Sequence, residues 1–315
     1  MKIKKLIIRG IILGGVIVSS ILGIGGCSTD TAEKEDGVLN IVATTTMLND
    51  LAGVIGGDNV KSIGLMGPGI DPHLYEASAG DVSKMQDADV VLYNGIHLEG
   101  KMGEIFENLK SEEKNIICIE NGIDETDILK DVETKGALDP HIWFDVNIWI
   151  DAAEYVADEL IKIDPDNTNE YKTNLENYLV ELEELDEYVK ERVSEVNEKQ
   201  RVLVTAHDAF GYFGNAYGFE VKGLQGITTD AEAGTADVSK LATFIATNKI
   251  KAIFVESSVP PKNIEALQDA VKAQGFDVEI GGELYSDSLG DKSTGHDTYI
   301  LTVKANIDTI VDALK

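Results

Sequence analysis

The sequence of residues 166–200 is DNTNEYKTNLENYLVELEELDEYVKERVSEVNEKQ, a run without glycine or proline. Apolar side chains recur in this run at spacings of three and four, and acidic side chains fill most of the gaps. This periodicity indicates an amphipathic helix. The apolar positions are Tyr171, Leu175, Tyr178, Leu179, Leu182, Leu185, Val189, Val193 and Val196.

A single helix over this run would be unusually long. About 34 residues at 1.5 Å per residue give a length of ~50 Å, which exceeds the width of a typical domain. Such a helix is either a coiled coil or a connection that crosses both halves of the protein. The apolar stripe covers under about five heptads and lacks a strict a/d repeat, so we favour the second interpretation and predict a spine helix within residues 164–200.

Short apolar runs of strand length alternate with amphipathic runs on both sides of the spine helix. Before it, the sequence predicts strands at 39–44, 60–66, 89–93 and 115–119 and helices at 47–55, 82–86 and 102–109. After it, the sequence predicts strands at 202–205, 221–224, 252–255 and 277–280 and helices at 238–248, 263–274 and 298–314. This alternation favours parallel sheets covered by helices on both faces. We therefore predict an α/β protein with lobes at residues 38–163 and 201–315.

The first 26 residues have the layout of a secretory signal peptide, with a basic start and an apolar run broken by glycine and serine. The run is too short and too rich in glycine for a good membrane span. It ends in Ile24-Gly25-Gly26-Cys27, which resembles the lipobox of bacterial lipoproteins. We predict a signal peptide at 1–26, diacylation of Cys27 and a polar tether at 27–37, which would anchor an exported protein to the outer face of the bacterial cytoplasmic membrane. The alternative is a simple cleaved signal with an incidental cysteine.

Charge and cysteine content narrow the classes of partner. Acidic residues outnumber basic ones 56 to 27, so the chain lacks the basic footprint of a nucleic-acid-binding protein. This charge suits a cationic ligand, although most of it is expected to be solvated surface. With Cys27 acylated, Cys118 has no disulfide partner and is interpreted as a small buried side chain without a function.

Histidines occur in matching contexts. Two of the five stand in near-identical phrases, Ile70-Asp71-Pro72-His73-Leu74 and Leu138-Asp139-Pro140-His141-Ile142, and His207 follows the apolar run 202–206. Ligands of parallel sheets collect beyond the carboxyl ends of the strands, and proline stiffens the loops that present two of the imidazoles. Neutral imidazole is the commonest ligand of first-row divalent metals. Three histidines need a fourth ligand, and composition does not identify the carboxylate that supplies it.

These features together resemble the metal-binding lipoproteins of bacterial ABC uptake systems, the zinc/manganese solute-binding family also called cluster 9 or A-I. The resemblance covers residues 38–315. It rests on the lipobox, the two Asp-Pro-His loops, Ala206-His207-Asp208 and the spine helix. Further matching phrases are Asn94-Gly-Ile-His-Leu-Glu-Gly100, Trp143-Phe-Asp-Val146, Phe254-Val-Glu-Ser-Ser258 and Leu284-Tyr-Ser-Asp-Ser-Leu289.

The resemblance implies two pseudo-symmetric α/β domains with one metal ion in the cleft between them. It assigns as metal ligands His73, His141, His207 and Asp297. His296 is the rival for the fourth position and is expected to point to solvent, and His97 is expected to make a loop hydrogen bond. Glu256 either accepts a hydrogen bond from a ligating imidazole or caps the following helix.

The resemblance also implies a function, which is capture of a divalent transition metal and its delivery to an ABC permease and its ATPase. The protein would be a monomer. It would not be an enzyme, because four protein ligands leave no open position for a catalytic water. The cargo would be Zn²⁺ or Mn²⁺, with Fe²⁺ behind them, since residues 121–138 lack the histidine-rich loop of many zinc receptors. The alternatives are a surface adhesion lipoprotein, a secreted metallohydrolase with the same ligands and a receptor for a metal chelate.

Overall fold

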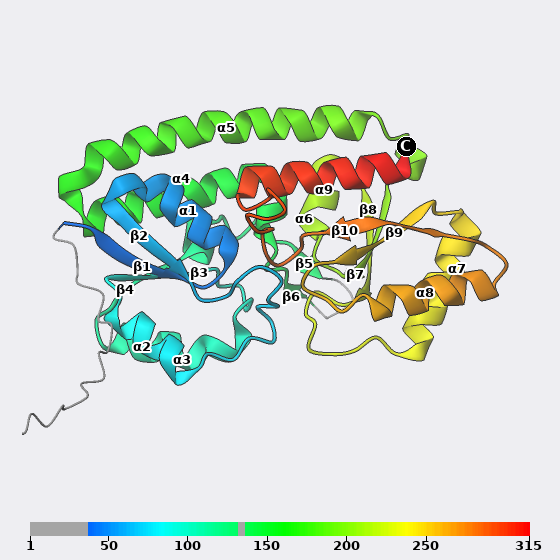
Figure 1. Cartoon of the computed structure of the whole chain (residues 1–315), viewed down its shortest axis with the longest axis horizontal. Coiled ribbons are helices and arrows are strands. Elements are labelled where there is room, and N and C mark those ends of the chain that lie inside the picture. Colours follow the sequence, from blue (N-terminus) through cyan, green and yellow to red (C-terminus); the bar gives the residue numbers. More distant parts are fainter. Residues whose placement is uncertain (1–36, 132–135) are drawn as a thin grey trace, which may run out of the picture. The chain divides into compact units, whose positions relative to one another are not determined.

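The computed structural model describes residues 37–131 and 136–315 (Figure 1). Residues 37–315 form one compact unit. The predicted signal peptide, the lipidation site Cys27 and nearly all of the tether lie outside the described residues. Among the residues described, no helix is both long and apolar enough to cross a membrane.

The N-terminal half contains a four-stranded parallel sheet in the order β2-β1-β3-β4. Its strands are β1 (Leu39–Ala43), β2 (Val60–Gly64), β3 (Val90–Tyr93) and β4 (Asn115–Cys118). Its helices are α1 (Thr46–Gly56), α2 (Ala79–Asp87), α3 (Gly103–Ser111) and α4 (Val146–Ile163). Ile41 and Ala43 of β1 pack in the hydrophobic cluster that includes α1 and α4, whereas Val42 packs in the cluster that includes α2 and α3. Helices therefore cover both faces of the sheet, as its alternating side chains require.

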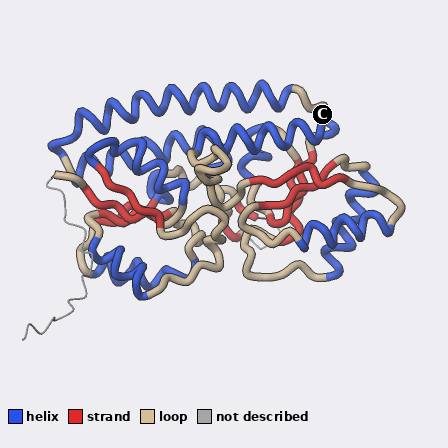
Figure 2. The backbone as a smooth tube through the Cα atoms, in the orientation of Figure 1, coloured by secondary structure: helices blue, strands red, loops and turns tan. Residues whose placement is uncertain are grey.

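The C-terminal half repeats this arrangement. Strand β7 (Val202–His207) pairs in parallel with β8 (Glu220–Gln225), β9 (Ala252–Glu256) pairs in parallel with β10 (Glu279–Leu284), and β7 lies beside β9. The four strands lie in the spatial order β8-β7-β9-β10, which corresponds to β2-β1-β3-β4, although their backbone hydrogen bonds form two two-stranded sheets. The helices of this half are α6 (Gly211–Tyr217), α7 (Thr235–Asn248), α8 (Lys262–Ala273) and α9 (Tyr299–Leu314). Figure 2 shows the strands as two groups, and the predicted α/β fold with parallel sheets is confirmed.

A small antiparallel pair, β5 (Lys130–Asp131) with β6 (Ala137–Leu138), precedes the His141 loop. The long helix α5 (Thr168–Ser194) follows α4. The Asn174 side chain donates to the carbonyl oxygen of Ile55 in the N-terminal half, and Arg192 Nε donates to Asp308 of α9 at 2.7 Å. The helix therefore contacts both halves, as predicted for the spine.

The spine helix is shorter than the predicted 34 residues, because it ends at Ser194. The Asn197 side chain accepts a hydrogen bond from Lys199 N at 3.0 Å and begins a separate 3₁₀ turn. Asparagine competes in this way with the backbone bonds of a helix. The apolar periodicity extends to Val196, which is buried, but the hydrogen-bonding side chain at Asn197 decides where the helix ends.

Strand β10 continues past the predicted end at Ile280, through Gly281 and Gly282 to Leu284. A Cβ atom at Gly281 would lie 2.7 Å from both Phe254 and Ala313 and 3.0 Å from Ala252. The register of β10 against β9 shifts between Ile280 and Glu283. Glycine therefore allows the strand to pass close to β9 and α9, and it marks an irregular strand rather than the end of one.

This close approach predicts that Gly281→Ala destabilises the protein. The added methyl group would overpack a buried contact, and we expect a loss of about 1–3 kcal/mol in the free energy of unfolding, measured by urea denaturation. The matched control is Gly53→Ala in α1, where nothing lies within 4 Å of the added Cβ. The control should gain up to about 1 kcal/mol from helix propensity, and equal effects of the two substitutions would contradict this account of β10.

Candidate metal centre

The site lies at the carboxyl ends of strands from both halves. His73 follows β2 and His141 follows β6 in the N-terminal half, and His207 ends β7 in the C-terminal half. The fourth member, Asp287, stands three residues after the end of β10. All four side chains are buried, and one potential ligand atom of each lies within 4.8 Å of the others. Among the described residues, no other group of three or more histidine, cysteine or carboxylate side chains converges in this way.

Four of the distances between these atoms match those of a tetrahedral cation site. His141 Nε2 lies 3.3 Å from His73 Nε2 and 3.3 Å from His207 Nε2. Asp287 Oδ1 lies 3.4 Å from the Nε2 atoms of His141 and His207. A tetrahedral ion with ligands at about 2.0–2.1 Å requires ligand-to-ligand separations of about 3.3–3.4 Å. Four of the six separations thus have the length that such an ion requires.

Two of the imidazoles are oriented by carboxylates behind them. Asp139 Oδ1 lies 2.7 Å from His141 Nδ1, and Glu256 Oε2 lies 2.5 Å from His207 Nδ1. A carboxylate only accepts hydrogen bonds, so each Nδ1 carries a proton. Each Nε2 faces the site, where it can give a lone pair to a bound cation once it has lost its own proton. Of the two roles considered for Glu256, the structure places its carboxylate against an imidazole.

The two Asp-Pro-His phrases form the same turn. Asp71 Oδ1 accepts a hydrogen bond from His73 N at 2.8 Å, and Asp139 Oδ1 accepts one from His141 N at 3.0 Å. Such Asx turns use a short acidic side chain to fix the backbone two residues further on. The repeated phrase therefore has a local structural cause, because it holds a histidine at a defined position in each loop.

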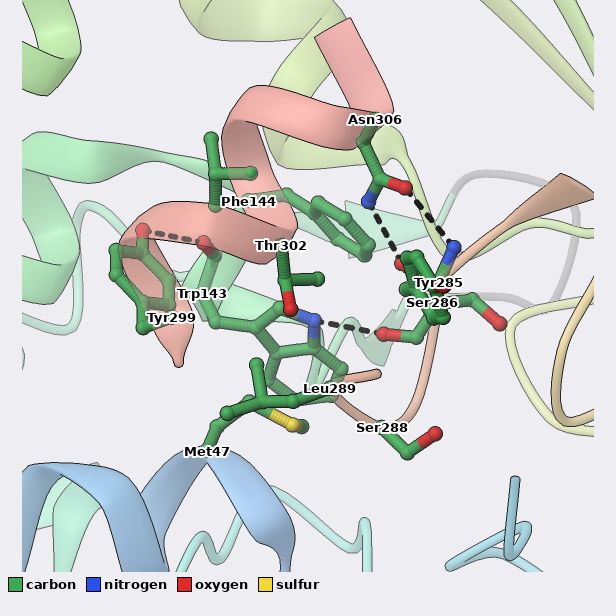
Figure 3. A pocket seen from close by; sticks show the side chains of 11 residues that line it. Met47, Trp143, Phe144, Tyr285, Ser286, Ser288, Leu289, Tyr299, Thr302 and Asn306 are labelled. Atoms are coloured by element: carbon green, nitrogen blue, oxygen red, sulfur yellow. Dashed lines mark hydrogen bonds between the residues drawn. The ribbon is translucent and has the colours of Figure 1, made fainter. Parts of the chain in front are cut away.

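Asp287 is held by a network that involves both halves. Ser258 Oγ donates to Asp287 Oδ2 at 3.0 Å, whereas Asp287 Oδ1 is buried and has no hydrogen bond to a described residue. Figure 3 shows the neighbouring pocket, in which Trp143 Nε1 donates to Ser286 O at 2.9 Å and Asn306 bonds the backbone of Tyr285. The loop thus fixes one carboxylate oxygen and leaves the other facing the imidazoles.

The charges of the site favour a bound cation. Burial lowers the pKa of His73 to about 3, so this imidazole is neutral. Burial also lowers the pKa of His141, but Asp139 and Asp287 outweigh that effect and raise it to about 9. Burial raises the pKa of the Asp287 carboxyl, yet the surrounding imidazoles hold it well below its usual value. The carboxylates therefore stabilise positive charge at these buried imidazoles, and a proton or a metal cation can supply that charge.

The predicted fourth ligand needs correction. Asp297 is half-buried in the loop directly before the Thr298 N-cap of α9, and it is not part of the converging group. Its negative charge adds to the effect of burial, which is the main cause of the raised pKa of Asp50. The carboxylate that joins the three imidazoles is that of Asp287. Asp287 lies in Leu284-Tyr-Ser-Asp-Ser-Leu289, one of the phrases that match the family, but the resemblance assigns the fourth position to Asp297 instead.

The remaining histidines lie apart from the group. His296 is half-buried, and its Nδ1 atom lies 3.2 Å from Tyr285 Oη rather than pointing only to solvent. His97 is exposed and has a positive φ of 62° in the turn after β3. Neither side chain contributes an atom to the cluster.

Fold and site together define a two-lobed α/β binding protein with a buried cluster of three histidines and one aspartate. The family described as "Zinc-uptake complex component A periplasmic" matches residues 41–313. The chain belongs to this family, and the resemblance inferred from the sequence is confirmed.

Several relatives match the chain over most of its length. Zinc-binding protein TroA of Treponema pallidum is 48% identical over 279 residues, which cover 89% of this chain and 90% of TroA. A solved structure of TroA has a TM-score of 0.85 to this chain and covers 88% of it and 99% of TroA. Manganese-binding lipoprotein MntA of Bacillus subtilis is 43% identical, with 96% and 99% of the two chains covered. Iron ABC transporter substrate-binding lipoprotein MtsA of Streptococcus pyogenes is 32% identical, with 95% and 96% covered.

The position of Asp297 beside Asp50 generates a prediction about pH. Burial is the main cause that raises the pKa of Asp50 from 3.8 to about 6, while a hydrogen bond from Tyr299 N lowers it and Asp297 raises it. The folded state binds more protons than the unfolded state between these values. The contribution of Asp50 to stability is therefore complete below pH ~4 and is lost as the pH rises through ~6.

Asp50→Asn should remove this dependence, because the amide oxygen still accepts from Tyr299 N and carries no charge. We expect the variant to be more stable than the wild type by about 1–3 kcal/mol at pH 7 and equal to it below pH ~4, measured by urea unfolding across this range. Glu183→Gln, at an exposed position of α5, is the control. A constant difference between Asp50→Asn and wild type at all pH values would contradict the assignment.

Proposed function

We propose that this chain is an extracytoplasmic solute-binding lipoprotein that captures one divalent transition-metal ion and delivers it to an ABC permease and its ATPase. The observation that carries the proposal is the convergence of four buried donors from both halves of the chain within 4.8 Å. Membership of the zinc-uptake component family supports it.

The proposed ligands are His73, His141, His207 and Asp287. Three imidazole nitrogens and one carboxylate oxygen complete a tetrahedral shell, whereas a hydrolytic zinc site keeps a position open for water. The burial of all four donors also favours storage of the ion over turnover of a substrate, because a bound ion would be shielded from solvent. We therefore propose binding and transport, not catalysis.

The proposed cargo is Zn²⁺ or Mn²⁺. A site with three nitrogen donors binds Zn²⁺ more tightly than Mn²⁺ by the Irving–Williams order, while a carboxylate suits harder ions. The names of the relatives include zinc, manganese and iron. Since raw affinity does not select Mn²⁺ here, delivery of Mn²⁺ would depend on which metal is available outside the cell.

The proposed attachment is through two acyl chains on Cys27, with residues 28–37 as a tether and the protein acting as a monomer. The sequence ending in Gly25-Gly26-Cys27 supports this attachment, and MntA and MtsA are themselves named lipoproteins. Two acyl chains suffice for stable anchoring. The tether would keep the binding unit close to a permease in the same membrane.

Loss of a proposed ligand should abolish tight binding. Asp287→Ala and His207→Ala should each weaken Zn²⁺ affinity by at least about 100-fold, since loss of an outer partner of a ligand alone costs 10–100-fold. Asp297→Ala is the matched control and should bind like the wild type. Chelator competition with one equivalent of Zn²⁺ or Mn²⁺ measures the affinities. A large loss in Asp297→Ala with none in Asp287→Ala would contradict the proposed ligand set.

Binding of the proposed cargo should also stabilise the fold. At a free Zn²⁺ concentration about 1,000 times Kd, the free energy of unfolding rises by about 4 kcal/mol, which corresponds to an increase of about 5–15 °C in Tm. Differential scanning calorimetry with and without a chelator measures the shift. A wild-type chain that gains no stability from Zn²⁺ or Mn²⁺ would contradict the proposed function.

A further inference from the structure

The two Asp-Pro-His loops differ in the further hydrogen bond that each aspartate carboxylate makes. In both loops one oxygen accepts the backbone N–H of the histidine. The same oxygen of Asp139 also orients the His141 imidazole. Asp71 instead accepts a hydrogen bond at its Oδ2 from the hydroxyl of Thr229, at 2.6 Å. Thr229 lies in the C-terminal half, so this bond joins the two halves beside the site.

His73 is the least constrained of the four donors. The Nδ1 atoms of His141 and His207 contact carboxylates, but His73 Nδ1 is buried without a hydrogen-bond partner among the described residues. The loop around it carries two exposed apolar side chains, Ile70 and Leu74. The position of this imidazole therefore depends on what holds the loop rather than on a partner of the ring.

Two hydrogen bonds hold the His73 loop against the C-terminal half. Gly69 N donates to Ser288 Oγ at 2.8 Å, and Thr229 Oγ1 donates to Asp71 Oδ2. Thr229 is itself buried in the loop after β8, where Gln225 Nε2 donates to Ala231 O at 3.0 Å. Thr229 is therefore held in place by its own loop. Its hydroxyl donates to the same Asp71 carboxylate that accepts the hydrogen bond from His73 N.

We propose that Thr229 is a positioning residue that latches the His73 loop across the two halves and sets the rate at which the cargo ion leaves. The inference rests on the proposed function and concerns the same site. With the latch broken, the His73 loop separates from the C-terminal half and withdraws its imidazole first. The ion then keeps three ligands, His141, His207 and Asp287, and one coordination position is open. Water or a ligand from the molecule that receives the ion binds there.

The latch can be tested by the dissociation rate of Zn²⁺ from the loaded full-length chain, measured by rapid mixing with excess chelator. Thr229→Val keeps the shape of the side chain and removes the hydroxyl. Hydrogen bonds to charged groups correspond to roughly ten- to a hundredfold in an equilibrium constant, so we expect dissociation to be at least about tenfold faster. Thr229→Ser should restore the wild-type rate. Thr228→Val, at the neighbouring position, is the matched control and should dissociate like the wild type.

A double-mutant cycle separates a latch from a general loss of stability. Asp71→Ala should itself accelerate dissociation, and adding Thr229→Val to it should cause no further change. The metal-free Thr229→Val chain should remain folded, with a Tm lowered only by the loss of this one hydrogen bond, and Thr229→Ala replaces this variant should it not fold. Wild-type dissociation in Thr229→Val, or additive effects in the double variant, would overturn the latch. A wild-type chain that binds neither Zn²⁺ nor Mn²⁺ would overturn the proposed function as well.

Discussion

The site depends on the burial of three imidazoles and one carboxylate close together. A buried polar group is stable only when it is paired, and here the backs of two imidazoles are paired with Asp139 and Glu256. The Nε2 atoms of these two imidazoles face Asp287 Oδ1, which lies 3.4 Å from each. Folding therefore forms the outer contacts of a cation site. The buried Asp287 carboxylate is stabilised by positive charge, and this favours a cation as the ligand.

The matching strand orders explain how two halves come to share one site. In the N-terminal half, Thr44 at the end of β1 donates its hydroxyl to the buried Glu99 carboxylate at 2.6 Å. In the C-terminal half, His207 at the end of β7 contacts the buried Glu256 carboxylate. In the C-terminal half the carboxylate ends β9, the strand beside β7, and in the N-terminal half it lies in the turn after β3, the strand beside β1. The contact with the carboxylate thus involves a hydroxyl, Thr44, in the N-terminal half. In the C-terminal half it orients the imidazole of His207 toward the site.

The sequence predicted most of the fold and three of the four converging donors, and its failures have physical causes. Strand and helix periodicities and the Asp-Pro-His phrases are local signals, and a local turn holds His73 and His141. Asp287 stands in a phrase that matches the family, but no local pattern distinguishes its carboxylate from the others of the chain, and its approach to the imidazoles is visible only in the folded structure. Asp297 was preferred because it precedes a helix in a phrase that matches the family. Which carboxylate reaches the site is a long-range property, and no periodicity encodes it.

The way the halves are joined limits how the site can open. One hydrophobic cluster includes Ile41 of β1, Leu182 of α5 and Phe254 of β9, so it is continuous through both halves. Helix α5 is bonded to both as well. A large rotation of one half against the other would expose this core, and exposure costs about 25 cal/mol for each Å² of apolar surface. Movement of a surface loop breaks few apolar contacts by comparison. Local displacement of a donor loop is therefore the less costly route to an open site, and the His73 loop, whose imidazole has no partner behind it, is the donor loop that meets this condition.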